Sequence, residues 1–183
     1  GPPNPPRTAE LDCYENKLTE LDLSHVSQLT NLCSSENQLT ELDLFNVPQL
    51  TELRCHKNQL TDLDLSQNPL LTVISCGENQ LANLDLSNVP QLTELWCDAN
   101  QLTDLVLSNI TPRAELYCYE NKLTELDLSN VSQLTNLCSS ENQLTKLDLF
   151  NVPQRTELRC HQNPLTDFDL PPNPLQTVTL FSN

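Results

Sequence analysis

Apolar and polar positions repeat along this chain every 21 residues, without insertion or deletion. Each repeat has a leucine, or once an isoleucine, at a fixed place and an asparagine five residues later. The first column is Leu11, Leu32, Leu53, Ile74, Leu95, Leu116, Leu137 and Leu158, and the second is Asn16, Asn37, Asn58, Asn79, Asn100, Asn121, Asn142 and Asn163. A fixed period of this length predicts a solenoid, because one coil buries its apolar edge only against neighbouring coils.

Both halves of each coil predict strands rather than helices. Residues 50–59 read LTELRCHKNQ and residues 60–70 read LTDLDLSQNPL, and apolar and polar residues alternate in both. This period of two places successive side chains on opposite sides of an extended chain. We expect an all-β-rich solenoid of eight coils and a partial ninth, with strand-like segments on both faces and little or no helix. The asparagine is expected to bond backbone groups where the chain leaves the first strand.

Six cysteines occupy the second inward position of the first strand, where a small, soft hydrophobe packs well. They are Cys13, Cys55, Cys76, Cys97, Cys118 and Cys160. A zinc site is disfavoured because no CxxC occurs and outward residues such as His56 lie on the opposite side of the strand. Disulfides are disfavoured because parallel strands about 4.8 Å apart match disulfide geometry poorly. We expect a column of free thiols and no metal or other cofactor.

Two coils depart from this rule, because their cysteine comes one residue early. Ser34 and Ser139 then take the inward position, whereas Cys33 and Cys138 point outward. The outward thiols either cross-link two molecules or are merely exposed.

The length is consistent with one domain and a continuous one-dimensional core. Residues 1–7, GPPNPPR, resemble the remnant of a removed tag followed by a Pro-rich leader, and residues 8–183 form the repeat domain, expected to be a fragment of a larger protein. Neither a transmembrane stretch nor a signal peptide is present in the sequence.

Acidic residues dominate both predicted faces. The chain has 25 acidic and nine basic residues, a formal net charge of −16, and every acid falls at an outward position. Nucleic acid and anionic membrane are therefore poor partners, because both require cationic surfaces.

An aspartate column marks the second face. Like charges opposite one another destabilise strand pairs, so the column suggests either a solvated acidic surface or bound calcium. Its members are Asp22, Asp43, Asp64, Asp85, Asp127, Asp148 and Asp169, and Val106 interrupts it.

A block of five coils is duplicated. Residues 118–163 repeat residues 13–58 with four differences, of which the replacement of Leu50 by Arg155 falls at a core position. Arg113 occupies the same column, so both arginine stems are expected to line the core while the guanidinium groups reach out. We expect the C-terminal half to be the less stable half.

Four large aromatic residues lie outward on the first face, which we expect to be concave. Trp96, Tyr117 and Tyr119 fall on adjacent coils and are flanked by four acids, and Tyr14 lies apart. Tryptophan and tyrosine are enriched at interface hot spots, although lateral stacking between strands is an alternative role. The candidate ligand-binding patch is Trp96, Tyr117, Tyr119, Asp98, Glu94 and Glu115, with Glu120 beside it.

Arg54 with His56, and their copies Arg159 with His161, are secondary candidate sites. No Ser/His/Asp or Cys/His arrangement is evident, and carboxylates on an open surface have no means of separating their pKa values. The sequence therefore predicts no enzyme and no catalytic residue.

The repeat ELRCHKNQLTDLDLSQNPLLT resembles the 21-residue, cysteine-bearing leucine-rich repeats of the internalin J type found in bacterial proteins. The resemblance implies a secreted or cell-surface module of the adhesion or virulence kind, which binds a protein, or a glycan, through its concave face. Given the acidic surface, we expect the partner to have a basic surface. We expect this protein to be a monomer, apart from any intermolecular disulfide through Cys33 or Cys138. The alternatives are the recognition arm of a larger effector whose catalytic domain is absent, acting in the host cytoplasm, and a structural or ice-facing threonine array.

Overall fold

The computed structural model describes residues 1–2, 8–172 and 177–179. Most of the proposed leader, residues 3–7, and residues 180–183 of the partial ninth coil lie outside this range. The strands have three residues each: β1 Glu10–Asp12, β2 Asn31–Cys33, β3 Glu52–Arg54, β4 Val73–Ser75, β5 Glu94–Trp96, β6 Glu115–Tyr117, β7 Asn136–Cys138, β8 Lys146–Asp148, β9 Glu157–Arg159, β10 Asp167–Asp169 and β11 Thr177–Thr179. The described residues contain no helix, and so none that could span a membrane.

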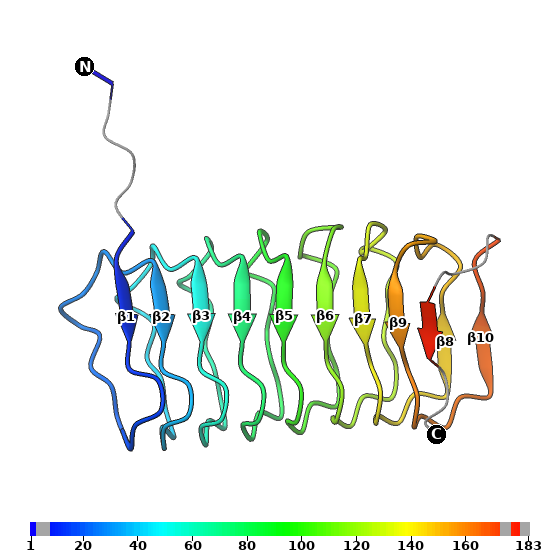
Figure 1. Ribbon diagram of the computed structural model, residues 1–183, viewed down its shortest axis with the longest axis horizontal. Coiled ribbons are helices and arrows are strands. Elements are labelled where there is room, and N and C mark those ends of the chain that lie inside the picture. Colours follow the sequence, from blue (N-terminus) through cyan, green and yellow to red (C-terminus); the bar gives the residue numbers. More distant parts are fainter. Residues whose placement is uncertain (3–7, 173–176, 180–183) are drawn as a thin grey trace.

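The first half of every coil contributes one strand to a parallel, nine-stranded sheet. Its strand order is β1-β2-β3-β4-β5-β6-β7-β9-β11, and Figure 1 shows the strands side by side along the long axis of the molecule. The register places equivalent residues opposite one another, so that Leu53 pairs with Ile74 and Arg54 with Ser75. We call the solvent side of this sheet the sheet face, and the side formed by the second halves of the coils the opposite face.

The second halves alternate inward and outward side chains as predicted, but a regular strand forms there only at β8 and β10 among the described residues. In a typical coil Leu42 and Leu44 are buried around exposed Asp43. Most of these segments share one recurring backbone hydrogen bond with the next coil, such as Gln59 N–H to the Leu39 carbonyl. Inward packing, rather than a hydrogen-bonded ladder, therefore holds most of the opposite face.

The asparagine column joins successive turns. The Asn58 side-chain amide donates to the Cys55 carbonyl of its own coil and to the Ser34 carbonyl of the preceding coil, and its oxygen accepts the Leu39 N–H. The same pattern recurs at the other asparagines of this column that have a preceding coil. This confirms the structural role predicted for them. The residue before each asparagine has a positive φ, as at Lys57 (φ 55°) and Ala99 (φ 49°). This left-handed turn was not predicted, because no glycine occupies the position.

Five of the six predicted inward cysteines are fully buried, and all eight are free thiols. Cys13 is half-buried because no coil precedes its own. Burial raises the pKa of the Cys55 and Cys118 thiols to about 12. Ser34 and Ser139 take the inward position in their coils, as predicted, and their hydroxyls have no hydrogen-bond partner among the described residues.

The predicted position of the two arginine stems is wrong. Arg113 and Arg155 are exposed, and the residues that follow them, Ala114 and Thr156, are buried instead. In coils with leucine at this position the turn closes by a bond such as Leu50 N–H to the Val47 carbonyl, but at Arg155 it closes one residue later, from Thr156 N–H to the Pro153 carbonyl. The turn shifts by one residue because a guanidinium is costly to bury.

Candidate functional site

The aromatic patch is organised around a stacked pair on neighbouring strands. Trp96 of β5 and Tyr117 of β6 are opposite one another in the sheet register. Their ring centroids lie 3.6 Å apart, with an angle of 10° between the ring planes. Trp96 also donates its indole N–H to Glu94 at 3.0 Å, and Glu115 accepts a bond from Asn136 at 3.0 Å. The pair is half-buried, so it combines lateral packing with an accessible apolar surface.

Asp98 and Tyr119 form the second row of the patch. Asp98 is buried, and Tyr119 is half-buried and hydrogen-bonds to its carboxylate. Burial raises the pKa of the Asp98 carboxyl, and burial together with the Asp98 charge raises the pKa of Tyr119 well above its usual value. Coils are numbered from the N-terminus, so that coils 3, 4 and 5 contain β3, β4 and β5. Asp98 of coil 5 fits here because Gly77 of coil 4 lies beside it, where a Cβ atom would overlap the Asp98 carboxylate.

The patch and the Arg54–His56 site, treated as separate in the sequence, border one hollow. Ser75 and Gly77 of coil 4 are small, whereas the equivalent positions hold Arg54 and His56 in coil 3 and Trp96 and Asp98 in coil 5. The resulting hollow has a volume of about 250 Å³, and it is lined by Arg54, His56, Val73, Ser75, Gly77, Glu78, Glu94, Trp96, Asp98 and Tyr119. We call it the coil-4 hollow.

Ion pairing and burial reduce the positive charge around this hollow. Arg54 is paired with Glu52 at 3.0 Å. Burial lowers the pKa of His56, whose Nδ1 lies 2.8 Å from the Ser35 hydroxyl and 3.2 Å from that of Ser75. Burial therefore favours the neutral form of His56, and carboxylates outnumber cations in the lining of the hollow.

The Ser–His contacts were missed in the sequence, because the two residues are 21 positions apart. His161 and Ser140 repeat the contact at 2.9 Å. Ser35 and Ser140 are both buried beneath the histidine rings, so their hydroxyls anchor the rings and are closed to solvent. Coil periodicity was the available signal, since residues 21 apart are neighbours in this frame.

The remaining predicted residues lie outside the hollow. Tyr14 is exposed on the first coil. A hydrogen bond with the Glu36 carboxylate raises the pKa of the Tyr14 hydroxyl to about 12. Arg159 and His161 lie on coil 8, away from the stacked pair, and Glu120 lies beyond Tyr119. Cys138 is half-buried beside Tyr117, and Cys33 is half-buried beside Arg54.

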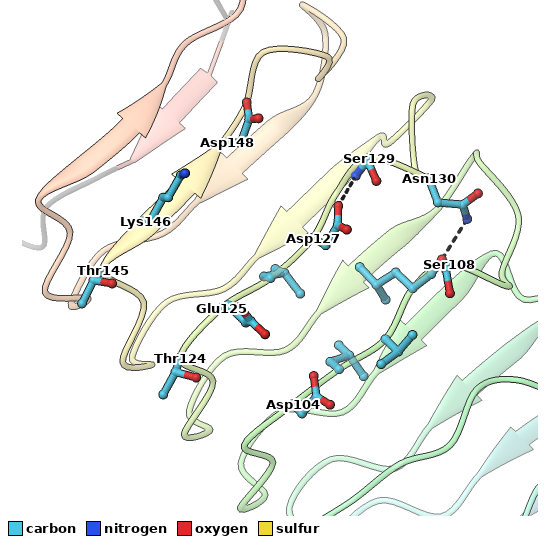
Figure 2. Close-up of a pocket in the computed structure, with 14 residues that line it drawn as sticks. Asp104, Ser108, Thr124, Glu125, Asp127, Ser129, Asn130, Thr145, Lys146 and Asp148 are labelled. Carbon is cyan, nitrogen blue, oxygen red and sulfur yellow. Dashed lines mark hydrogen bonds between the residues drawn. The ribbon is translucent and has the colours of Figure 1, made fainter.

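A second hollow, of about 670 Å³, lies on the opposite face where Val106 interrupts the aspartate column. Figure 2 shows that its polar lining residues come from three successive coils, with Asp104, Glu125 and Lys146 among them. Val106 is 54% exposed. This hollow has no aromatic lining residue.

The aspartate column has a local structural role that the sequence reading missed. Asp64 and Asp127 each accept the backbone N–H of the serine two residues later at 2.9 Å, and Figure 2 shows the Asp127 bond. Hydrogen bonding from the serine lowers the pKa of both carboxyls, chiefly through the Ser66 hydroxyl at Asp64 and through the Ser129 backbone N–H at Asp127. In the described part of the chain no cluster of three His, Cys, Asp or Glu side chains is placed to hold a metal ion.

Comparison with solved structures identifies the fold family. The functional domain of InlJ from Listeria monocytogenes, which includes a cysteine ladder, superposes on 88% of this chain with a TM-score of 0.81 and 37% sequence identity. This chain is a leucine-rich repeat domain. YopM from Yersinia enterocolitica matches over 96% of the chain with a TM-score of 0.69 and 26% identity. The internalin InlF of Listeria monocytogenes, at 22% identity and a TM-score of 0.71 over 89% of the chain, shares the fold.

This leucine-rich repeat domain spans only part of these proteins: 38% of the InlJ chain, 53% of the InlF chain and 42% of the YopM chain. No protein-family model matches it, and no curated protein does. The similarities support a protein-interaction module, because the neighbours are leucine-rich repeat domains.

Proposed function

We propose that this domain is a non-enzymatic protein-binding module of a bacterial surface or secreted protein of the adhesion or virulence kind, and that it binds through the sheet face. The observation that carries the proposal is the Trp96–Tyr117 stack, which presents a large apolar surface on rigid strands. Tryptophan and tyrosine with these properties anchor many interfaces. The surrounding carboxylates favour a partner with a basic surface, and they make association sensitive to salt.

A panel of purified extracellular proteins, probed with the labelled domain, tests this proposal. Binders of the wild type are remeasured with the double variant Trp96→Ala and Tyr117→Ala and with Val106→Asp, a control on the opposite face. We expect the double variant to lose binding, at about 2 kcal/mol or more for each residue, while Val106→Asp binds normally. Binding that survives in the folded double variant, or is lost in Val106→Asp, would contradict a site on the sheet face.

The second candidate is the recognition arm of a larger effector that acts inside a host cell. The similarity to YopM over 96% of the chain favours it, and the small share of each relative that the domain spans is compatible with further domains. The same sheet face would then serve a cytoplasmic partner. Repeating the binding panel with cytosolic proteins separates the two candidates.

A further inference from the structure

The coil-4 hollow has the dimensions of a slot for one flat chemical group. Its walls come from coils 3 and 5, two strand spacings or about 9.6 Å apart. Between these walls coil 4 has the small residues Ser75 and Gly77, and it also contributes Val73 and Glu78 to the lining. Flat groups stack at the separation seen between Trp96 and Tyr117, 3.6 Å. One additional layer therefore fits against Trp96.

Trp96 presents one free ring face to this slot. Its other face is covered by Tyr117, which does not line the hollow. Ser75 is the register partner of Trp96 on the open side, and a serine leaves the indole uncovered.

The charged residues that line the hollow indicate which kind of flat group it would bind. The hollow is lined by three carboxylates, Glu78, Glu94 and Asp98, against a single cation, Arg54, which is already paired with Glu52. Lys57, outside the lining, lies 3.9 Å from Glu78 and is shared with Glu36. A flat cation satisfies both requirements, because it stacks on the indole face and donates hydrogen bonds to carboxylates. Guanidinium has this shape, whereas the lysine ammonium is a compact, strongly hydrated charge.

We propose that the coil-4 hollow is a specificity pocket for one arginine side chain of the partner protein, with its guanidinium stacked on Trp96 and hydrogen-bonded to Asp98 and Glu78. This inference rests on the proposed binding function and names the chemistry of its central contact. An aromatic ring would fill the same space but add no positive charge beside the carboxylates.

Trp96 is the only tryptophan of the chain, so its fluorescence reports on the slot directly. The probes are N-acetyl-arginine methylamide and the corresponding lysine and tyrosine derivatives, titrated at constant ionic strength. We expect a saturable change in Trp96 fluorescence with the arginine probe. The lysine probe should bind roughly threefold to fivefold more weakly, because it lacks the stacking contribution of a flat cation. No response to arginine, equal affinity for lysine, or tighter binding of tyrosine would each overturn the proposal.

Two matched variants test the location of the pocket. Ser75→Tyr adds a ring on the free face of Trp96 and closes the slot, whereas Cys138→Tyr extends the same stack beyond Tyr117 and leaves the slot open. We expect Ser75→Tyr to abolish the arginine response and Cys138→Tyr to retain it. The reverse result, or the same response in both, overturns the proposal. If the arginine probe does not bind to the wild type while partner binding still requires Trp96 and Tyr117, the arginine pocket is refuted and the proposed function stands.

Discussion

Leu50 and Arg155 occupy the same position in two copies of one five-coil block, yet Leu50 is fully buried and Arg155 is exposed. The flanking sequences are the same, VPQ before and TEL after. Within this turn, the substitution is therefore the one difference that accompanies the one-residue shift that places Thr156 inward. Leucine fills this core column more completely than threonine does.

Arg155→Leu should stabilise the domain by about 1–2 kcal/mol, because the turn can return to the Leu50 arrangement and refill the column. The gain is smaller than that of a full leucine burial, since Thr156 already occupies part of the space. Chemical denaturation with a reductant present measures the change.

The reciprocal variant Leu50→Arg is the matched control and should lower stability in the first copy. An unchanged midpoint in both variants would mean that the shifted turn packs as well as the leucine turn.

The periodic positions of this chain were predictable, and the departures from the period were not. The columns of Leu53, Cys55 and Asn58 follow from the repeat, because each position has the same neighbours in every coil. The placement of Arg155 depends instead on which of two turns the chain forms before the strand. Reading its column as fixed gave a buried stem that the structure does not have.

Ser139→Cys should also stabilise the domain, by about 1 kcal/mol. Among the residues that the structure describes, the buried Ser139 hydroxyl has no hydrogen-bond partner. Such a group costs free energy that a thiol, a weaker polar group, largely avoids. Five other coils show that a cysteine fits this position in the buried state.

Ser34→Cys is the internal replicate, because Ser34 has the same local sequence and burial. Equilibrium unfolding under reducing conditions gives both values. Destabilisation of both variants would show that these hydroxyls make contacts that a thiol cannot replace.

The Trp96–Tyr117 stack should contribute to stability as well as to binding. Stacked aromatic pairs contribute about 0.5–1.5 kcal/mol beyond the area they bury. A double-mutant cycle of Trp96→Ala and Tyr117→Ala, measured by denaturation, should give a coupling energy in that range. Zero coupling would show that the rings stack without stabilising the sheet, and would leave binding as their only role.

The candidate site was only partly predictable for a related reason. Trp96 and Arg54 were each recognised from residue type and outward position. Their shared hollow depends on the two small residues between them, Ser75 and Gly77, and on the room that Gly77 gives to Asp98. An unoccupied volume belongs to no single residue, so a position-by-position reading of the sequence does not reveal it.

We expect the aspartate column to make the stability of the domain depend on pH in the acid range. Hydrogen bonds from the following serines lower the pKa of Asp22, Asp64, Asp85 and Asp127 in the folded chain below the ordinary value of 3.8. A carboxyl with a depressed folded pKa stabilises the fold above its unfolded pKa and loses this contribution as pH falls through the folded value. Stability should therefore be constant near pH 7 and decline below about pH 4.

Asp64→Asn tests this mechanism, because the amide oxygen can still accept the Ser66 N–H but does not titrate. We expect a slightly less stable protein at pH 7 and a smaller loss between pH 4 and pH 2 than in the wild type. Val106→Asp, which completes the column, should steepen that loss. Melting temperatures of the wild type, Asp64→Asn and Val106→Asp measured across this pH range test the mechanism. Parallel curves of melting temperature against pH for the three proteins would show that the aspartate turns do not control acid stability.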